Sequence, residues 1–186
     1  MMIVKDTSRA EDWQVYHKDL DEAYGTSYPA NELVLRLNED NHSWRSVDVW
    51  NSTSPTSSVF SLGNSSNTNH NGDDYVNYLF ASLSDISKVG SYTGTGSNVN
   101  VDCGFTSGAR FVLIKRHDSG TGDWYVWDST RGIVSGNDPY FLLNSTAAQV
   151  TNTDFIDPLN AGFTVTSSAP SDLNANGGKY MFLAIA

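Results

Sequence analysis

The sequence predicts an all-β protein, a jelly-roll-like β-sandwich built from two sequence-related units. Three observations predict this fold. Segments of the first half return in the second half about 105 to 111 residues later, which indicates an architectural repeat. Apolar residues alternate with polar ones almost everywhere, as in half-buried strands. No long stretch has the periodicity of a helix.

The repeat preserves alternating apolar residues and the residues that set the backbone. Met2–Lys5 returns as Val112–Lys115, and Asp12–His17 returns as Asp123–Asp128. Two further pairs follow in the same order: Leu35–Asn38 with Phe141–Asn144, and Asn69–Tyr75 with Asn174–Tyr180. The chain therefore divides into a first unit, residues 1–87, and a second unit, residues 88–186, which are either separate or merged into one sandwich.

Short strands separated by polar turns are expected along the whole chain. The run Phe111–Arg116 is almost entirely apolar and predicts a strand buried on both faces, whereas Phe163–Thr166 alternates and predicts one wet face. The expected strands are Met2–Lys5, Trp13–His17, Val34–Leu37, Val59–Leu62, Tyr75–Ser82, Lys88–Tyr92, Val99–Phe105, Phe111–Arg116, Trp124–Asp128, Tyr140–Leu143, Phe163–Thr166 and Tyr180–Ala184.

Turn formers and helix signals are unevenly distributed. Asn-Gly pairs at 71–72 and 176–177 favour tight turns, because both residue types tolerate positive φ. Only Ser145–Val150 and its counterpart Glu39–Trp44 are candidates for a short turn of helix.

The two units differ in how they begin. The second unit starts with two extra strands, Lys88–Tyr92 and Val99–Phe105, whereas the first starts directly with Met2–Lys5. The first unit is therefore expected to be incomplete, with an open sheet edge beside Met2–Lys5. Open edges invite pairing with another chain, so we expect a homo-oligomer or a subunit of a larger assembly.

Composition excludes several classes of partner. The formal net charge of −10 argues against nucleic acid, since phosphate binding needs clustered Lys and Arg. The single cysteine, Cys103, excludes an internal disulfide and a cysteine-based zinc site. No window approaches the roughly 20 apolar residues of a membrane helix, and no signal peptide is expected at the start.

No catalytic pattern stands out, so we do not expect an enzyme. The four histidines, His17, His42, His70 and His117, lack a nucleophile motif nearby and are interpreted as solvent-facing residues at strand ends. Pairs of carboxylates occur by chance among 21 acidic residues, and the acidic segments lack the spacing of a calcium loop. No metal and no cofactor are therefore predicted.

The aromatic residues fall into two groups. Those that recur in both units are expected to be largely buried: Trp13 with Trp124, Tyr16 with Trp127, and Tyr75 with Tyr180, together with Trp50 opposite Ile156. Those without a counterpart, in loops peculiar to the first unit, are candidates for binding. This candidate site comprises Tyr24, Tyr28, His42, Trp44 and Arg45. Such residues suit a protein interface, a glycan site with stacking faces and polar tips, or incidental exposure.

The motif string of the second unit resembles one unit of a repeat domain found in structural proteins of marine tailed phages. The string runs Phe105-x-x-Gly108-x-x-Phe111-Val112-x-Ile114-Lys115-Arg116-x-Asp118, Gly122-Asp123-Trp124-x-x-x-Asp128-x-x-Arg131-Gly132, Asn144-Ser145-Thr146-Ala147-Ala148, Gly162-Phe163-Thr164-Val165 and Asn174-x-Asn176-Gly177-Gly178-x-Tyr180. The match covers residues 88–186 well and residues 1–87 in part. There the insertion Asp19–Glu32 replaces the counterpart of Arg131.

The resemblance implies a virion protein, either a capsid decoration protein or a component associated with the tail or fibre. It implies contact with other virion proteins and carries no catalytic residues. A second hypothesis is a lectin-like, receptor-binding module that uses the unrepeated aromatic loops to recognise a host surface glycan in host attachment. A glycan-degrading enzyme on the particle has the weakest support.

Overall fold

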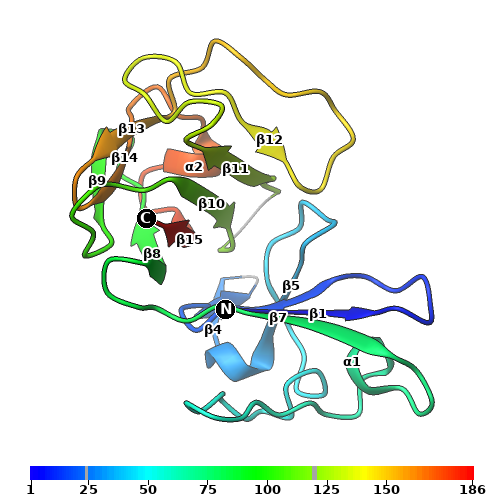
Figure 1. Ribbon diagram of the computed structural model, residues 1–186. Helices are drawn as coiled ribbons and strands as arrows, with labels where there is room; N and C mark the ends of the chain where they lie inside the picture. Colours follow the sequence, from blue (N-terminus) through cyan, green and yellow to red (C-terminus); the bar gives the residue numbers. More distant parts are fainter. Residues whose placement is uncertain (24, 119–120) are drawn as a thin grey trace.

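The computed structural model describes residues 1–23, 25–118 and 121–186, and it is all-β with several antiparallel sheets, compatible with a β-sandwich (Figure 1). The first half of the chain forms the lower part of the view and most of the second half forms the upper part. The described residues include no helix long and apolar enough to cross a membrane.

The first large sheet, sheet A, has the strand order β6-β5-β2-β1-β7. Its central strand pair is β1 with β2, and β7 pairs with β1 from Met2↔Leu79 to Asp6↔Tyr75. The strands of sheet A are β1 (Met2–Asp6), β2 (Gln14–Tyr16), β5 (Leu33–Arg36), β6 (Trp44–Arg45) and β7 (Tyr75–Leu79).

The second large sheet, sheet E, has the order β12-β11-β10-β15-β8. Through the repeated segments, β12-β11-β10-β15 corresponds strand by strand to β5-β2-β1-β7, while β8 has no counterpart in sheet A. The strands of sheet E are β8 (Ser87–Thr93), β10 (Phe111–Arg116), β11 (Trp124–Asp128), β12 (Phe141–Leu142) and β15 (Lys179–Ile185).

Smaller elements complete the fold. Sheet F has the order β13-β14-β9, and β3 pairs with β4 in a two-stranded ribbon. Their bounds are β3 (Glu22–Ala23), β4 (Thr26–Ser27), β9 (Val99–Asp102), β13 (Ile156–Leu159) and β14 (Gly162–Val165). The helical turns are η1 (Ala30–Glu32), α1 (Ser66–Asn69) and α2 (Ser171–Asn174).

Strand alternation divides the interior into stacked hydrophobic layers. Odd residues of β1 and β10, such as Ile3 and Leu113, meet in one cluster between sheets A and E. The even residues of β10, Val112 and Ile114, point to the other face of sheet E, where sheet F covers them. The even residues of β1 pack beneath a loop that contains Trp50. Each large sheet is therefore covered on both faces, which explains the nearly continuous apolar runs of its central strands.

Several sequence expectations differ from the structure. Ser145–Val150 and Glu39–Trp44 are not helical; the short helices are α1 and α2, each in the loop before β7 or β15. Val59–Leu62 is not a strand. In the second unit β14 pairs with β9, whereas within the described chain no strand lies beside Val59–Leu62 to pair with it. Conversely, Ile156–Leu159 forms β13, which the proline at 158 concealed.

The predicted burial of the repeated aromatics is confirmed for Trp124, Trp127, Tyr180, Tyr16 and Trp50. The prediction is too strong for Trp13 and Tyr75, which are half-buried. Trp13 lies just before β2 and Tyr75 begins β7; Trp13 stacks on the exposed Tyr78 with ring centroids 6.4 Å apart.

The predicted open edge beside Met2–Lys5 is wrong. β1 is paired on both sides, by β2 and by β7, so its backbone groups are satisfied within the chain. The strand order instead leaves β7 at the edge of sheet A. In sheet E the equivalent strand, β15, is covered by β8. Among the described residues, β7 has no such neighbour.

The solvent-facing interpretation is also wrong for two of the histidines. His17 and His117 are buried, at 0% and 1% exposure, because both lie where sheets A and E meet. His42 is half-buried and His70 is exposed.

Candidate functional site

The structure separates the candidate aromatic residues onto two faces of sheet A. Tyr28 packs against the central cluster between sheets A and E, whereas Trp44 packs against the cluster beneath the Trp50 loop. Trp44 and Arg45 are neighbours on β6, so their side chains point to opposite faces. Tyr24 lies outside the described residues.

Tyr28 and Arg45 are the members that the structure brings together. The Arg45 guanidinium lies over the Tyr28 ring, with Cζ 5.1 Å from the ring centroid. Its Nε also donates to Glu32 Oε2 at 2.8 Å. Glu32 belongs to η1, so this group ties the loop before β5 to the edge strand β6. A cation over an aromatic face is favourable and orders both side chains.

Trp44 is engaged on the other face. The Arg36 guanidinium lies 4.6 Å from the Trp44 ring centroid and pairs with Glu39 Oε1 at 3.0 Å and with Asp12 Oδ2 at 3.0 Å. The ring is half-buried, and Arg36 already occupies one of its faces. His42 is half-buried on the loop just before β6, where it interacts with other groups of the protein.

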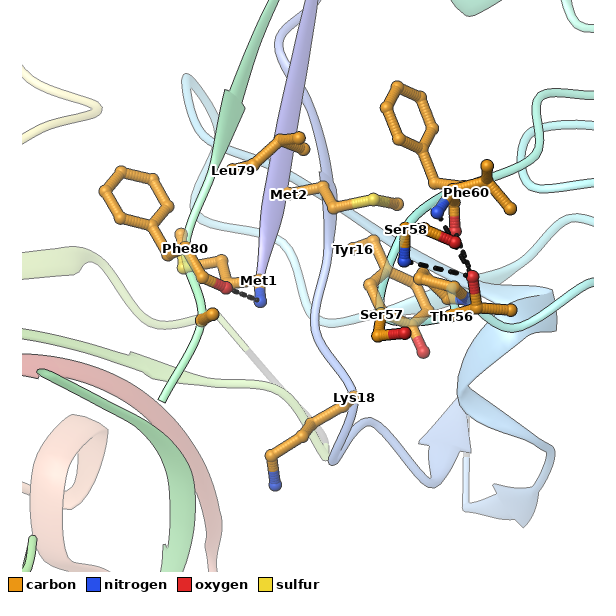
Figure 2. Close-up of a pocket in the computed structure, with 13 residues that line it drawn as sticks. Met1, Met2, Tyr16, Lys18, Thr56, Ser57, Ser58, Phe60, Leu79 and Phe80 are labelled. Carbon is orange, nitrogen blue, oxygen red and sulfur yellow. Dashed lines mark hydrogen bonds between the residues drawn. The ribbon is translucent and has the colours of Figure 1, made fainter. Parts of the chain in front are cut away.

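A second candidate surface was not predicted from the sequence. An open cavity of about 620 Å³ lies beside the end of β7, between β1 and the loop that contains residues 55–60 (Figure 2). Met2 and Leu79 line one side of it, and the loop brings Phe60 and the hydroxyl groups of Thr56, Ser57 and Ser58 to the other. No sequence motif marks this cavity, because it forms where a loop replaces a second sheet.

Exposed apolar side chains are frequent on β7 and on the segment that follows it in the sequence. Of the large apolar residues that are exposed in the described chain, four lie in a short stretch from β7 to the start of β8: Tyr78, Leu79, Leu83 and Ile86. A fifth, Val59, lines the same cavity as Leu79. Tyr78 and Leu79 are neighbours on β7 and point to opposite faces, so the apolar patch at the end of β7 is the one that Leu79 forms with Val59. An exposed apolar patch is typical of an interaction surface.

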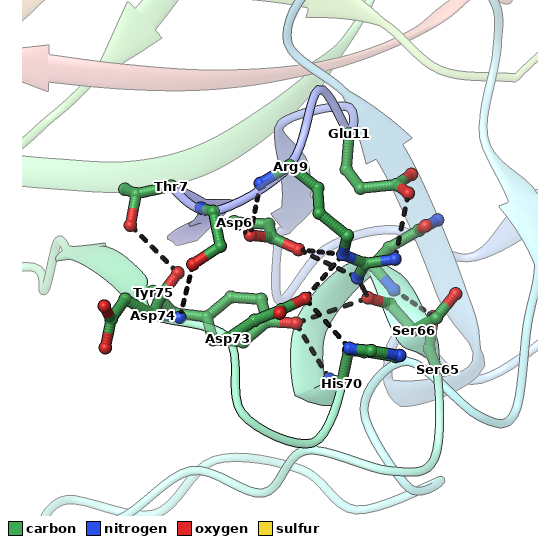
Figure 3. A network of polar contacts seen from close by, with 12 residues as sticks. Asp6, Thr7, Arg9, Glu11, Ser65, Ser66, His70, Asp73, Asp74 and Tyr75 are labelled. Atoms are coloured by element: carbon green, nitrogen blue, oxygen red, sulfur yellow. Dashed lines mark hydrogen bonds and ion pairs between the residues drawn. The ribbon is translucent and has the colours of Figure 1, made fainter.

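A polar network closes the opposite end of β7 (Figure 3). Arg9 forms ion pairs with Asp6, Glu11 and Asp73, and it donates to the carbonyl oxygen of Ser66. These contacts join the β1–β2 turn to α1 and to the start of β7. The Asp6 carboxylate also accepts from the backbone N–H groups of Ser8 and Arg9; the hydrogen bonds that Asp6 accepts outweigh its desolvation and lower its pKa. The network is a structural clamp, since its carboxylates are already paired.

The buried titratable groups likewise serve as contacts between sheets. Lys115 is enclosed and its Nζ donates to the carbonyl oxygens of Asp40, at 3.0 Å, and Gly122, at 2.6 Å; burial lowers its pKa to about 8. His17 Nδ1 accepts from the Asp19 N–H, and Nε2 lies 3.3 Å from the Phe182 carbonyl oxygen. Burial lowers the pKa of His17 to about 3, so the ring is neutral at pH 7.

No group of three or more His, Cys, Asp or Glu side chains within the described residues is arranged to hold a metal ion. Cys103 is buried, and desolvation raises the pKa of its thiol to about 12. The candidate surfaces are thus formed by aromatic, apolar and hydroxyl side chains.

The fold and these surfaces define an all-β protein with stacked antiparallel sheets and an apolar patch at one sheet edge. The chain belongs to the family described as a domain of unknown function (DUF7483), which matches residues 1–186. No curated protein and no solved structure matches the chain.

Proposed function

We propose that the chain is a structural protein of a phage particle, a capsid decoration protein or a tail- or fibre-associated component, and that it assembles through its sheet surfaces without catalysis. The motif resemblance of residues 88–186 supports the setting. The observation that carries the assembly role is the apolar patch at the end of β7, next to an uncovered sheet edge. Other virion proteins and further copies of the chain are its partners in this proposal.

The proposal includes a jelly-roll-like sandwich built from two related units, residues 1–87 and 88–186. Two sets of matched hydrogen bonds support it. Tyr75 Oη accepts from the N–H five residues earlier, at 2.8 Å, and Tyr180 Oη does the same at 2.7 Å. Asn38 and Asn144 each accept from the N–H of the matched tryptophan, at 3.0 and 2.9 Å. The passage of the chain from β8 to β9 and from β14 back to β15 supports the sandwich within the second unit.

The test is to look for the chain in purified particles of the phage that encodes it. Mass spectrometry of density-purified virions, with peptide counts compared against the major capsid protein, measures its copy number. We expect a fixed stoichiometry that survives repeated purification. Recovery of the chain only from the lysate, and never from particles, would refute the proposal.

A second candidate function is receptor binding by a lectin-like module, which the cavity at residues 55–60 favours. Its aromatic Phe60 and its serine and threonine hydroxyls offer a stacking face and hydrogen-bonding groups together. A glycan array with the wild-type chain and a Phe60→Ala variant tests this function. Binding that the variant loses supports it, and an array without binding rejects it.

A further inference from the structure

We propose that β7 is a self-association edge, on which a second copy of the chain adds its own β7 antiparallel, so that two sheets A become one continuous sheet. This inference deepens the proposed assembly role and rests on it for biological context.

The backbone groups on the outer side of β7 are identified by its pairing with β1. Met1 and Phe80 exchange both backbone hydrogen bonds, and Thr7 N–H donates to the Asp74 carbonyl oxygen. Hydrogen-bonded pairs recur at every second residue of an antiparallel ladder. The backbone groups of Val76 and Tyr78 therefore face β1, and those of Tyr75, Asn77 and Leu79 face outward, where the described chain supplies no strand.

Sheet E shows how such an edge is covered. Tyr180, Phe182 and Ala184 are the repeat counterparts of Tyr75, Asn77 and Leu79. Their outer edge pairs with β8 over seven registered residues, from Lys179↔Thr93 to Ile185↔Ser87. α2 comes before β15 as α1 comes before β7, so the two edges are reached by the chain in the same order.

β7 also lacks the features by which edge strands avoid association. Charges, proline and very short length are the common protections. The remaining edges of sheets A, E and F carry one or more of them: Arg45 in β6, two-residue length in β6 and β12, Lys88 in β8, Asp157 and Pro158 in β13, and Asp102 in β9. From Tyr75 to Ser84 the chain has no charged residue and no proline.

The occupant is a second copy because β7 is complementary to itself. In an antiparallel pair centred on Asn77, Asn77 faces Asn77 and Tyr75 faces Leu79, so every outward N–H and C=O of these three residues finds a partner. Asp73 and Asp74 then face Ala81 and Phe80, and no acid meets an acid. With a net charge of −10, two copies repel each other over most of their surface, and an uncharged segment is where they can meet.

Cysteine cross-linking tests the register. In the centred pair the two Asn77 Cα atoms are about 5.5 Å apart, within disulfide range, whereas the two Leu79 Cα atoms are separated by about 14 Å. We expect Asn77→Cys to form a disulfide-linked dimer under mild oxidation. Leu79→Cys, at a position that is exposed like Asn77, is the matched control and stays unlinked, as does the wild type with its buried Cys103. Equal cross-linking of Asn77→Cys and Leu79→Cys would overturn the centred register.

Sedimentation of the full chain tests the association itself. The tag belongs at the C-terminus, because the Met1 amino group donates to Phe80. We expect a concentration-dependent species at twice the 20.3 kDa monomer mass, weakened at least tenfold by Asn77→Lys, which places like charges face to face. Ser91→Lys, on the exposed edge strand β8, is the control and leaves association unchanged. A monomer at high concentration, or an oligomer that Asn77→Lys leaves intact, would refute the proposal. If the chain forms a β7 dimer in solution but is absent from virions, only its proposed location on the phage particle is refuted.

Discussion

The indole of Trp124 donates to the carbonyl oxygen of Arg36 at 2.8 Å, and so fastens sheet E to a strand of sheet A. The same N–H reaches the Glu39 carbonyl oxygen at 3.1 Å, and Lys115 beside it holds Asp40. The loop after β5 is therefore bound by the second half of the chain. These hydrogen bonds therefore join the two sheets.

Replacing Trp124 with phenylalanine should lower the free energy of unfolding by about 1–3 kcal/mol, because buried carbonyl groups lose their donor. Chemical denaturation measures the change. Trp13→Phe is the matched control, since Trp13 occupies the same repeat position but is half-buried. We expect a smaller loss of unfolding free energy for Trp13→Phe. Equal losses at the two positions would contradict the role of Trp124 in joining the two sheets.

Acid should weaken the protein through His17. Above pH 6.5 the ring is neutral in both states; below it the unfolded chain takes up a proton that the folded ring, with a pKa of about 3, does not. His17 therefore costs up to about 1.4 kcal/mol of stability per pH unit as pH falls from 6.5 toward 3. The stability of wild type relative to His17→Gln should decline over this range in pH-dependent denaturation, and a flat difference would argue against a buried neutral ring.

Asp138 should behave in the opposite way. Its carboxylate is buried and accepts from the N–H groups of Phe155 and Ile156, at 3.1 and 3.0 Å, while desolvation raises its pKa to about 6. Because the folded pKa lies above the unfolded value, its ionisation destabilises the fold as pH rises through 6. Asp138→Asn should thus be nearly neutral or stabilising at pH 8. Asp138→Ala should cost about 1–3 kcal/mol at the same pH, since it leaves buried donors without an acceptor. Denaturation curves of both variants distinguish charge from hydrogen bonding.

The repeated tyrosines should contribute unequally. Tyr180 Oη donates to the Ser171 carbonyl oxygen at 2.6 Å and its side chain is fully buried, whereas the matched Tyr75–Ser66 contact is 3.3 Å and half-exposed. Tyr180→Phe should therefore cost about 1–2 kcal/mol and Tyr75→Phe less than about 1 kcal/mol. Thermal unfolding of the two variants measures both stability losses, and a larger loss for Tyr75→Phe than for Tyr180→Phe would contradict the prediction.

The sequence predicted the all-β class and most strands of the central ladders because apolar alternation is a local signal. It did not predict that Ile3 and Leu113, equivalent in the repeat, would face each other between two sheets. It also misassigned the open edge, since the order β2-β1-β7 depends on long-range pairing. The candidate aromatic residues were identified because they have no counterpart in the second unit. This criterion could not show that Trp44 and Arg45, as neighbours on one strand, point to opposite faces. The cavity at residues 55–60 has no sequence signal.

We propose that the chain assembles on a phage particle through β7, and high-resolution imaging of intact virions is the decisive measurement. We expect density for the chain at regular positions, with β7 of one copy antiparallel to β7 of another and Asn77 at the two-fold axis. Particles without the chain, or copies in which the β7 edge faces solvent, would contradict it.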